Sequence, residues 1–382
     1  MLKIKININS VAIISSQAFS LFNFRGPLIC DLVANGVTVF ALAPDYDDEN
    51  RQKIISIGAE PIDYCLVRAG MNPFRDVLDT LKLAVLLRRL RPTVTLGYFI
   101  KPVIFGTLAA SLAGVPRRVA MIEGLGYVFT SSGGRDPVHR QVLLAMVSRL
   151  YRFALSRAHK VIFLNSDDID EFVGAGLVKE SKVIKLGGIG VDLAHWPFTE
   201  PITQPVTFLL AARLLREKGI VEYVEAARLV KARHSHVRFV LLGGLDPNPG
   251  GLGQPEVIAW VNEGLLEWPG HVAVKPWLAQ TSVYVLPSYY REGVPRSTQE
   301  AMAMGRAVIT TNAPGCRETV DEGVNGFLVP VRDVPALAAA MMRFVERPAL
   351  IAVMGLESRR LAEDRFDVHK INARLLDVLV CS

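Results

Sequence analysis

The apolar residues of this chain follow two kinds of pattern that alternate along its length. Short apolar runs bounded by turn residues are typical of buried strands, and longer stretches with apolar residues three or four positions apart predict helices. The strand-like runs are residues 11–15, 37–43, 93–96, 119–122 and 161–164 in the first half, and 206–212, 239–242, 283–286 and 308–310 in the second. Because strands and helices alternate, we expect parallel sheets with helices on both faces.

The two groups of strands are separated by residues 187–205, a stretch rich in Gly and Pro with little periodicity, as expected of a linker. A chain of 382 residues is also too long for one ordinary domain and long enough for two cores. The pattern therefore predicts an α/β protein of two domains, with a boundary near residue 187.

The most informative segment for chemistry follows the strand 283–286 and reads PSYYREGVPRSTQEAMAMG. It sets Glu292 on a loop at the carboxyl end of the strand, and we expect Glu300 in the first turn of the next helix. Ligands of open α/β sheets bind at this edge, where the amides of a helix N-terminus also attract phosphate. As an alternative, Ser297 to Glu300 fits a capping box, and Glu292 could be an ordinary loop charge.

A second loop of interest follows the strand 206–212 and carries Arg213 and Lys218 before a helix that we expect to begin near Ile220. Two basic residues in a loop are usually solvated. Placed at the same edge of the sheet as Glu292, however, they could clamp a diphosphate.

Together with the segments VRFVLLGG (237–244) and AVITT (307–311), these loops form a recognisable pattern. The chain resembles the family-four retaining glycosyltransferases of the GT-B fold, and among them the bacterial capsule and O-antigen sugar transferases, including N-acetylgalactosaminyltransferases that act on polyprenyl-diphosphate sugars. The resemblance is specific over residues 206–330 and weaker over 98–129. It implies two Rossmann-like domains facing each other across a cleft. Residues 1–187 would be the acceptor and membrane-facing domain, residues 188–365 the nucleotide-sugar domain, and the C-terminal helix 366–382 would pack back on the first.

The resemblance also implies roles for individual residues. Arg213 and Lys218 would hold the nucleotide diphosphate and neutralise charge on the departing phosphate. Glu292 would bind hydroxyls of the donor sugar, with the amides of Gly293 and Val294 beside sugar and phosphate, and Glu300 would accept hydrogen bonds from the ribose. These groups suit those tasks, because ionised carboxylates only accept hydrogen bonds while Arg and Lys only donate them. The resemblance requires no metal ion and no cofactor beyond the nucleotide-sugar substrate.

Two features of the family are absent from the first half of the chain. Relatives carry a glycine pair in the first loop and a histidine after a middle strand. Here the first loop, residues 15–20, reads SSQAFS, and Glu123 lies near the histidine position. Glu123 could act at the reacting centre, although we favour an ordinary charge at the end of a strand.

Charge is distributed unevenly along the chain. Residues 81–160 hold 13 Lys and Arg against 2 Asp and Glu, and two helical stretches, 81–91 and 138–160, carry most of this excess among Leu, Val and Phe. Such helices suit an anionic membrane surface, although either helix alone could be a solvated face over a core. Nucleic acid is a poorer partner, since no recognition motif accompanies the charge.

Other candidate sites are weaker. Asp45 and Asp47 have the D-x-D spacing of some metal sites but lie in an acidic loop, DYDDEN, where solvated carboxylates are expected. His234 and His236 lack a third ligand nearby. The N-terminus reads as a first strand and not as a signal peptide, and the uncharged run of residues 102–116 is shorter than the ~20 residues that span a bilayer. We therefore expect a cytoplasmic protein bound peripherally to the inner face of the cytoplasmic membrane.

The sequence thus predicts a retaining transferase that moves a hexose or N-acetylhexosamine from a nucleoside-diphosphate sugar to a polyprenyl-diphosphate-linked saccharide. We expect UDP to be the nucleotide of the donor. Two alternatives remain. One is a GT-B-fold UDP-sugar epimerase, which would need no acceptor. The other is a membrane-bound scaffold with an inactive site, which is disfavoured because both glutamates and both cations are present.

Overall fold

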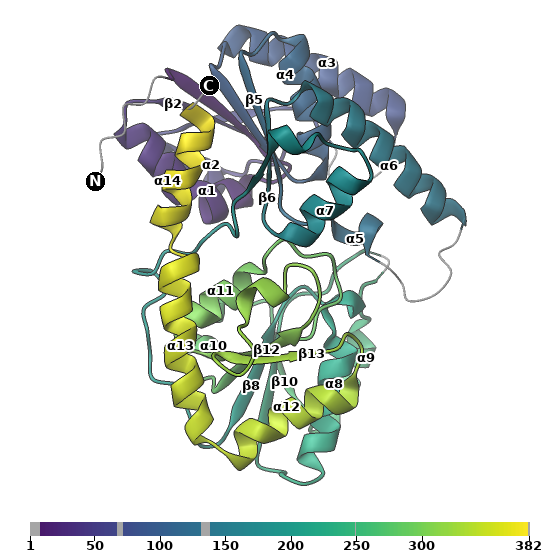
Figure 1. Cartoon of the computed structure of the whole chain (residues 1–382), viewed down its shortest axis with the longest axis vertical. Coiled ribbons are helices and arrows are strands. Elements are labelled where there is room, and N and C mark those ends of the chain that lie inside the picture. Colours follow the sequence, from purple (N-terminus) through teal and green to yellow (C-terminus); the bar gives the residue numbers. More distant parts are fainter. Residues whose placement is uncertain (1–7, 67–71, 131–137, 249, 381–382) are drawn as a thin grey trace. The chain divides into compact units, whose positions relative to one another are not determined.

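The computed structural model describes residues 8–66, 72–130, 138–248 and 250–380. The chain forms two compact units: Met1–Ile189 together with His369–Ser382, and Gly190–Val368. Each unit is built on its own parallel β-sheet covered by helices (Figure 1). The expected α/β class with two Rossmann-like sheets is therefore confirmed.

The sheet of the first unit has seven parallel strands in the order β3-β2-β1-β4-β5-β6-β7. Their bounds are β1 (Ser10–Ile14), β2 (Thr38–Ala43), β3 (Glu60–Asp63), β4 (Val94–Tyr98), β5 (Arg117–Ile122), β6 (Lys160–Phe163) and β7 (Val183–Lys185). The strand order reverses direction at β1, so helices of right-handed crossovers fall on opposite faces on the two sides of this point.

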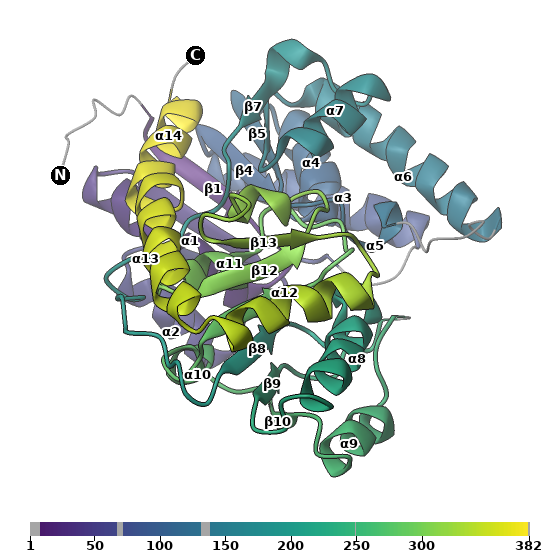
Figure 2. The same cartoon turned by 60° about the horizontal axis from the view of Figure 1, so that its bottom comes forward.

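The helices of this unit follow that rule. One face carries α1 (Ala18–Ala34) and α2 (Asp48–Ser56), which contact each other, and the other carries α3 (Pro73–Leu90), α4 (Thr107–Leu112) and α6 (Val138–Arg157), as Figure 2 shows. The remaining elements are α5 (Gly126–Phe129), α7 (Ser166–Gly174), the π-helical turn η1 (Pro102–Gly106) and the 3-10 turn η2 (Glu180–Lys182).

The C-terminal helix α14 (Val368–Val380) packs on the first unit. The Arg117 guanidinium donates a 2.6 Å hydrogen bond to the carbonyl of Val378, and the Asn372 amide donates to the carboxylate of Asp31 on α1 at 2.9 Å. Residues from both ends of the sequence thus complete one core.

The sheet of the second unit has six parallel strands in the order β10-β9-β8-β11-β12-β13. The strands are β8 (Thr207–Ala211), β9 (Arg238–Leu242), β10 (Glu267–Gly270), β11 (Val283–Leu286), β12 (Ala307–Thr311) and β13 (Gly326–Val329). The helices are α8 (Ile220–Lys231), α9 (Gln254–Asn262), α10 (Val274–Leu278), α11 (Arg296–Ala303), α12 (Val334–Glu346) and α13 (Ala349–Arg365), with 3-10 turns η3 (Arg216–Lys218) and η4 (Arg317–Thr319).

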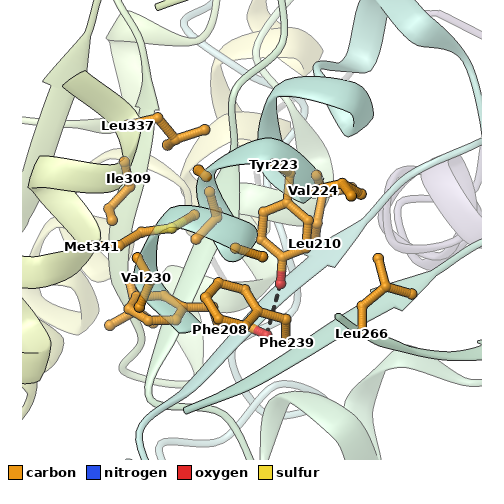
Figure 3. Packing of buried hydrophobic residues seen from close by; sticks show 14 of the residues in the cluster. Phe208, Leu210, Tyr223, Val224, Val230, Phe239, Leu266, Ile309, Leu337 and Met341 are labelled. Atoms are coloured by element: carbon orange, nitrogen blue, oxygen red, sulfur yellow. Dashed lines mark hydrogen bonds between the residues drawn. The ribbon is translucent and has the colours of Figure 1, made fainter. Parts of the chain in front are cut away.

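Aromatic packing fixes α8 on this sheet (Figure 3). Tyr223 of α8 is buried edge-on against Phe239, whose ring stacks on Phe208 with 5.2 Å between centroids. The Tyr223 hydroxyl lies 2.9 Å from the carbonyl oxygen of Phe208, so the polar end of this buried ring has a partner. This packing fixes the position of α8 relative to strands β8 and β9, and therefore also the position of the loop that joins β8 to α8.

All nine expected strands are present, each within two residues of its predicted bounds. The four strands that the apolar pattern missed are β3, β7, β10 and β13, and these are the edge strands of the two sheets. An edge strand pairs on one side only and need not be an apolar run, so β3 (EPID) and β10 (EWPG) even contain proline.

The Gly- and Pro-rich segment 187–205 is not a free connection along its whole length. From Gly190 onward it belongs to the second unit, where the buried Arg306 guanidinium holds the Thr199 carbonyl and Arg359 donates to the Trp196 carbonyl at 3.0 Å. Burial lowers the pKa of Arg306 to about 10. The division between the units falls at Ile189, inside the expected linker.

Candidate functional site

Three loops meet at the carboxyl edge of the second sheet. They follow β8, β11 and β12, which are neighbours in the sheet. Parallel strands end on the same side, so loops that are far apart in sequence come together there. Two of these loops carry the residues predicted from the sequence, Arg213 and Lys218 on the first, and Glu292, Gly293 and Val294 on the second.

Glycines allow these loops to approach each other closely. Gly219 has φ +76°, and a Cβ at this position would overlap the carbonyl of Pro287 at the end of β11. Gly315, after β12, has φ +75°, and its Cβ would overlap the carbonyls of Glu292 and Gly293. Only glycine combines this backbone conformation with such close contacts. The loop after β11 is therefore in backbone contact with Gly219 on one side and with Gly315 on the other.

Lys218 and Glu292 form an ion pair across the first two loops. Their side chains are only 13 % and 12 % exposed, and the Lys218 ammonium also lies 4.9 Å from the centre of the Tyr290 ring. A charge so poorly hydrated is costly unless it is paired, which explains why each side chain is turned toward the other. The structure thus brings together two of the three residues predicted to be catalytic.

A serine that the sequence analysis did not single out joins the same loops. Ser288 is fully buried, and its hydroxyl lies 3.0 Å from the Glu292 carboxylate and 3.2 Å from the carbonyl of Glu217, while the amide of Tyr290 donates to it at 3.2 Å. The Glu217 carbonyl also accepts the amides of Tyr289 and Tyr290. Ser288 directly follows Pro287 at the end of a buried strand, a position that could have identified it.

Arg213 pairs with a different carboxylate. Its guanidinium donates to the carboxylate of Asp246 at 2.8 Å, and its side chain is 46 % exposed. Burial raises the pKa of Asp246, but hydrogen bonds from Asn248 and the Arg213 charge outweigh burial and hold this pKa below its ordinary value. Asp246 is a second residue that the sequence analysis missed. It follows the Gly243–Gly244 pair after β9, at the same edge of the sheet.

Val294 is buried, and its carbonyl accepts a 3.0 Å hydrogen bond from the Gln299 amide group. The other end of the Gln299 side chain accepts from the amide of Gly190 at 3.1 Å. Gln299 is itself fully buried, so it ties the end of the second loop to the first residue of the unit.

The capping-box alternative for Glu300 is wrong. Helix α11 begins at Arg296, with Pro295 as its N-cap residue and no side-chain cap, so Ser297 lies inside the helix and its hydroxyl accepts from Tyr284 at 2.7 Å. Proline at the cap fixes φ near −60° and starts the helix earlier than the S-x-x-E spacing suggests. Glu300 is therefore the fifth residue of the helix and not in its first turn as expected.

Glu300 pairs with Arg296 of the preceding turn at 2.9 Å, and its side chain is 14 % exposed. Burial raises the pKa of the Glu300 carboxyl above its ordinary value of 4.5, and the Arg296 charge offsets only part of this rise. The carboxylate is thus held poorly solvated at the carboxyl edge of the sheet.

In the first unit, Glu123 pairs with Arg25, which is 2 % exposed and lies over the Tyr98 ring at 4.7 Å. A buried guanidinium needs a carboxylate partner, which favours a structural role for this charge at the end of β5. The loop after β1 is closed by hydrogen bonds of 2.7 Å that join Ser20 to Ser15 and to Tyr98.

Both carboxylates of the D-x-D spacing have structural tasks. Asp45 accepts the amide of Ala18 at the start of α1 at 2.6 Å, and Asp47 caps α2 by accepting the amide of Asn50 at 2.7 Å. Across the residues that the structure describes, no group of three or more His, Cys, Asp or Glu side chains could hold a metal ion.

Comparison with protein families matches both halves of the chain. Residues 15–165 match the model described as glycosyl transferase 4-like, and residues 205–347 match the model described as glycosyl transferases group 1. The second match contains all the site residues predicted from the sequence.

Among curated proteins, the chain is 29 % identical over 351 residues to the N,N'-diacetylbacillosaminyl-diphospho-undecaprenol alpha-1,3-N-acetylgalactosaminyltransferase of Campylobacter jejuni, covering 88 % of this chain and 89 % of that protein. It is 22 % identical to the capsular polysaccharide biosynthesis glycosyltransferase CapM of Staphylococcus aureus, over 77 % of this chain and 78 % of CapM.

Among solved structures, sucrose-phosphate synthase from Thermosynechococcus elongatus superposes with a TM-score of 0.76 at 18 % identity, covering 97 % of this chain and 98 % of that one. The HepE protein of Anabaena, solved in complex with UDP-glucose, gives 0.74 at 17 % identity, covering 98 % and 99 %. At these identities the likeness establishes the fold alone.

The raised pKa of Glu300 predicts a dependence of stability on pH. A carboxyl whose pKa is raised by folding contributes stability that is present below the ordinary value of 4.5 and lost as the pH rises through the folded value. Glu300→Gln cannot ionise, so we expect its melting temperature, relative to wild type, to increase between pH 4 and pH 7. Glu346→Gln, at an exposed position of α12, controls for the loss of one charge. A difference from wild type that stays constant over this range would contradict the assignment.

Proposed function

Because the chain belongs to the group 1 glycosyltransferases of the GT-B fold, we propose that it transfers a hexose or N-acetylhexosamine from a nucleoside-diphosphate sugar, with UDP as the nucleotide, to a polyprenyl-diphosphate-linked saccharide with retained anomeric configuration. The observation that carries this proposal is the paired Lys218 and Glu292 at the carboxyl edge of the second sheet, with Arg213 and Glu300 on the same edge. These are the cations and carboxylates that a sugar diphosphate requires.

The cations would bind the diphosphate. An ammonium has three donors, so Lys218 can retain its bond to Glu292 while donating to a phosphate oxygen. Arg213 is the more exposed of the two, and its planar guanidinium can bind two phosphate oxygens at once. Both would act most strongly as negative charge builds on the departing diphosphate.

The two carboxylates, Glu292 and Glu300, would accept hydrogen bonds from hydroxyl groups of the donor. Glu292, held by Lys218 and Ser288, would accept hydrogen bonds from the donor sugar, with the amides of Gly293 and Val294 beside the sugar and phosphate. Glu300 would accept those of the ribose. Each carboxylate is fixed by a partner within the unit before any ligand arrives, so little side-chain freedom is lost on binding.

For the chemical step we propose that the leaving diphosphate remains on the face of the sugar that the acceptor attacks. One of its oxygens would take the proton of the acceptor hydroxyl as the new glycosidic bond forms and the bond to the diphosphate breaks. The protein would then contribute orientation and stabilisation of charge through Arg213 and Lys218, without a carboxylate nucleophile.

The acceptor assignment rests on the relative from Campylobacter jejuni, whose name specifies an undecaprenyl-diphosphate-linked sugar and whose similarity extends over 88 % of this chain. The two curated relatives named above are transferases by name, sucrose-phosphate synthase is a synthase by name, and none of these three is named as an epimerase. The epimerase alternative therefore has no support from them.

Incubation with UDP-sugars, with and without a membrane lipid extract, tests the proposal and separates it from both alternatives. A transferase releases UDP and forms a glycolipid only when the extract is present. An epimerase converts the UDP-sugar without it, and an inactive scaffold consumes nothing. Mass spectrometry of nucleotide and lipid products distinguishes these outcomes, and a screen of donor sugars in the same assay identifies the sugar.

The acceptor is lipid-linked, so we also propose that the first unit docks on the anionic membrane surface. Helix α3 exposes an apolar stripe, and α6 exposes further apolar side chains, and among the described residues of the unit nothing covers them. The exposed residues are Phe74, Val77, Leu78, Leu81 and Val85 on α3, and Val138, Val142 and Phe153 on α6. Basic residues border them, which is the composition of helices that lie in a membrane interface. No helix in the described part of the chain is long and apolar enough to cross a membrane.

The diphosphate clamp yields a kinetic prediction. Arg213→Ala should reduce kcat by roughly tenfold to a thousandfold with a smaller change in donor KM, because Arg213 acts mainly as charge builds on the leaving group. Arg216→Ala is the matched control, since Arg216 lies in the same loop but pairs with Glu256 at 2.6 Å. Near-normal turnover of the Arg213 variant would remove this residue from the mechanism.

The two glutamates should differ in what they bind. Glu292→Gln should impair transfer while UDP still binds, because UDP lacks the sugar whose hydroxyls Glu292 would bind. Glu300→Gln should weaken the binding of UDP itself. Calorimetric titration of both variants with UDP measures the difference, and equal affinities would mean that the two roles are wrongly divided.

Docking on the membrane should depend on charge. Replacing Lys82, Arg89 and Arg91 together by Gln should reduce co-sedimentation with anionic liposomes and leave UDP affinity intact, whereas Arg88 is kept because it donates to the Leu112 carbonyl. Wild-type binding should weaken as salt shortens the Debye length from ~10 Å at 0.1 M to ~3 Å at 1 M.

The same number of charges removed outside α3 and α6, at Lys179, Arg233 and Arg347, serves as the control for this experiment. If the wild type does not sediment with anionic liposomes even at low salt, the basic helices are a solvated surface and do not dock.

A further inference from the structure

A groove in the first unit lies between α3 and α6. Helix α4, at six residues, is much shorter than α3 with 18 and α6 with 20, and it contacts both of them (Figure 1). The short helix and the preceding turn η1 form the floor, and the long helices form the walls. The groove has a volume of about 380 Å³ and is lined by Val77, Thr80, Leu81, Phe105, Leu108, Ser111, Leu112, Leu150, Phe153 and Arg157.

The lining is almost entirely apolar and is left in contact with water. Val77, Leu81 and Phe153 are each at least half exposed. Apolar surface in water costs roughly 25 cal/mol per Å², so a hydrocarbon chain that covers this surface gains free energy. The volume lies within the range of about 300–1,000 Å³ that is usual for ligand pockets.

One end of the groove is basic. Arg157 lines it, and Arg88 lies beside it, since its guanidinium donates to the carbonyl of the lining residue Leu112 at 2.8 Å. Arg118 adds a third charge by donating to the carbonyl of Arg157 at 2.8 Å. Within the part of the chain that the structure describes, none of these three arginines is paired with a carboxylate. The charge at this end of the groove therefore complements an anion.

We propose that the groove binds one acyl chain of an anionic membrane phospholipid, with the lipid phosphate held at Arg157 and Arg88. This inference rests on the proposed docking of the first unit at the membrane, and it goes further by assigning a defined lipid site to that surface. The lipid would hold the docked unit by a buried chain as well as by charge.

The position of the basic end favours a bilayer lipid over the lipid-linked acceptor. Arg157 lies three residues before β6, and Arg88 lies at the end of α3 just before β4, so both are near the amino ends of the strands. Substrates of α/β sheets bind at the carboxyl ends. A diphosphate held at these arginines would therefore lie at the opposite edge of this sheet from the one at which substrates bind.

Binding of a monomeric lipid to the full-length protein tests the site. The probe is dioctanoyl-phosphatidylglycerol below its micellar concentration, with dioctanoyl-phosphatidylcholine and farnesyl diphosphate as comparison ligands. Calorimetric titration of wild type should show one saturable site that prefers phosphatidylglycerol. Equal affinity for phosphatidylcholine would overturn the charge assignment, and binding of farnesyl diphosphate alone would assign the groove to an isoprenoid chain instead.

Two variants locate the site in the groove. Ser111→Trp fills the floor and should lower phosphatidylglycerol affinity at least tenfold, whereas Val85→Trp adds the same indole on α3 outside the groove and should have no effect. Arg157→Gln removes an exposed charge without filling the groove. It should lower the preference for phosphatidylglycerol about fivefold, which corresponds to the ~1 kcal/mol contributed by one basic residue.

The circular dichroism spectrum of each variant establishes folding. If Ser111→Trp is folded and binds phosphatidylglycerol as wild type does, the groove is not the site. If that variant does not fold, an unchanged lipid preference in Arg157→Gln overturns the proposal by itself.

The transfer assay separates this inference from the proposed function. Measured with the acceptor in detergent and without bilayer lipid, transfer by Ser111→Trp should equal that of wild type. A wild type that transfers sugar but binds no phosphatidylglycerol would overturn the lipid site alone. A wild type that binds the lipid but transfers no sugar would overturn the function and leave the lipid site standing.

Discussion

A buried serine hydroxyl is the contact on which the candidate site depends. Ser288 lies where the loops after β8 and β11 meet, and it reaches the Glu217 carbonyl and the Glu292 carboxylate together. These contacts fix the position of the loop after β11 relative to the loop after β8, and they place Glu292 opposite Lys218. The glycines at 219 and 315 make this possible, because any side chain there would force the loops apart.

The same arrangement places poorly solvated charges at the carboxyl edge of the second sheet, where we propose that the donor binds. Lys218 and Glu292 neutralise each other, and Glu300 is offset by Arg296, yet burial raises the pKa of Glu300 above its ordinary value. Such groups destabilise a protein slightly and are retained where pre-arranged charge serves binding. In the proposed function, the phosphates and hydroxyls of the donor would complete the hydrogen bonds of these groups and so offset part of this cost.

The first unit shows the opposite arrangement on the face that carries α3, α4 and α6. On this face the buried carboxylate of Asp76 on α3 pairs with Lys101, while large apolar side chains are exposed. Exposed apolar surface of this extent on a folded unit indicates a partner. On the proposal that this partner is a membrane, the basic residues around the surface favour anionic lipids, and the groove beside the short helix α4 would take a hydrocarbon chain.

The sequence by itself determined the interior strands, the two-domain α/β class and the loops that carry the site, because fully buried parallel strands must be apolar runs and their carboxyl ends must carry the polar residues. It could not determine the edge strands β3, β7, β10 and β13, which pair on one side only and tolerate proline. It also misplaced the start of α11, where Pro295 decided the boundary. Only the tertiary structure decided that Lys218 faces Glu292, that Arg213 faces Asp246 and that Ser288 joins the loops. These contacts span up to 74 positions and depend on which strands are neighbours in the sheet, a property that no local pattern encodes.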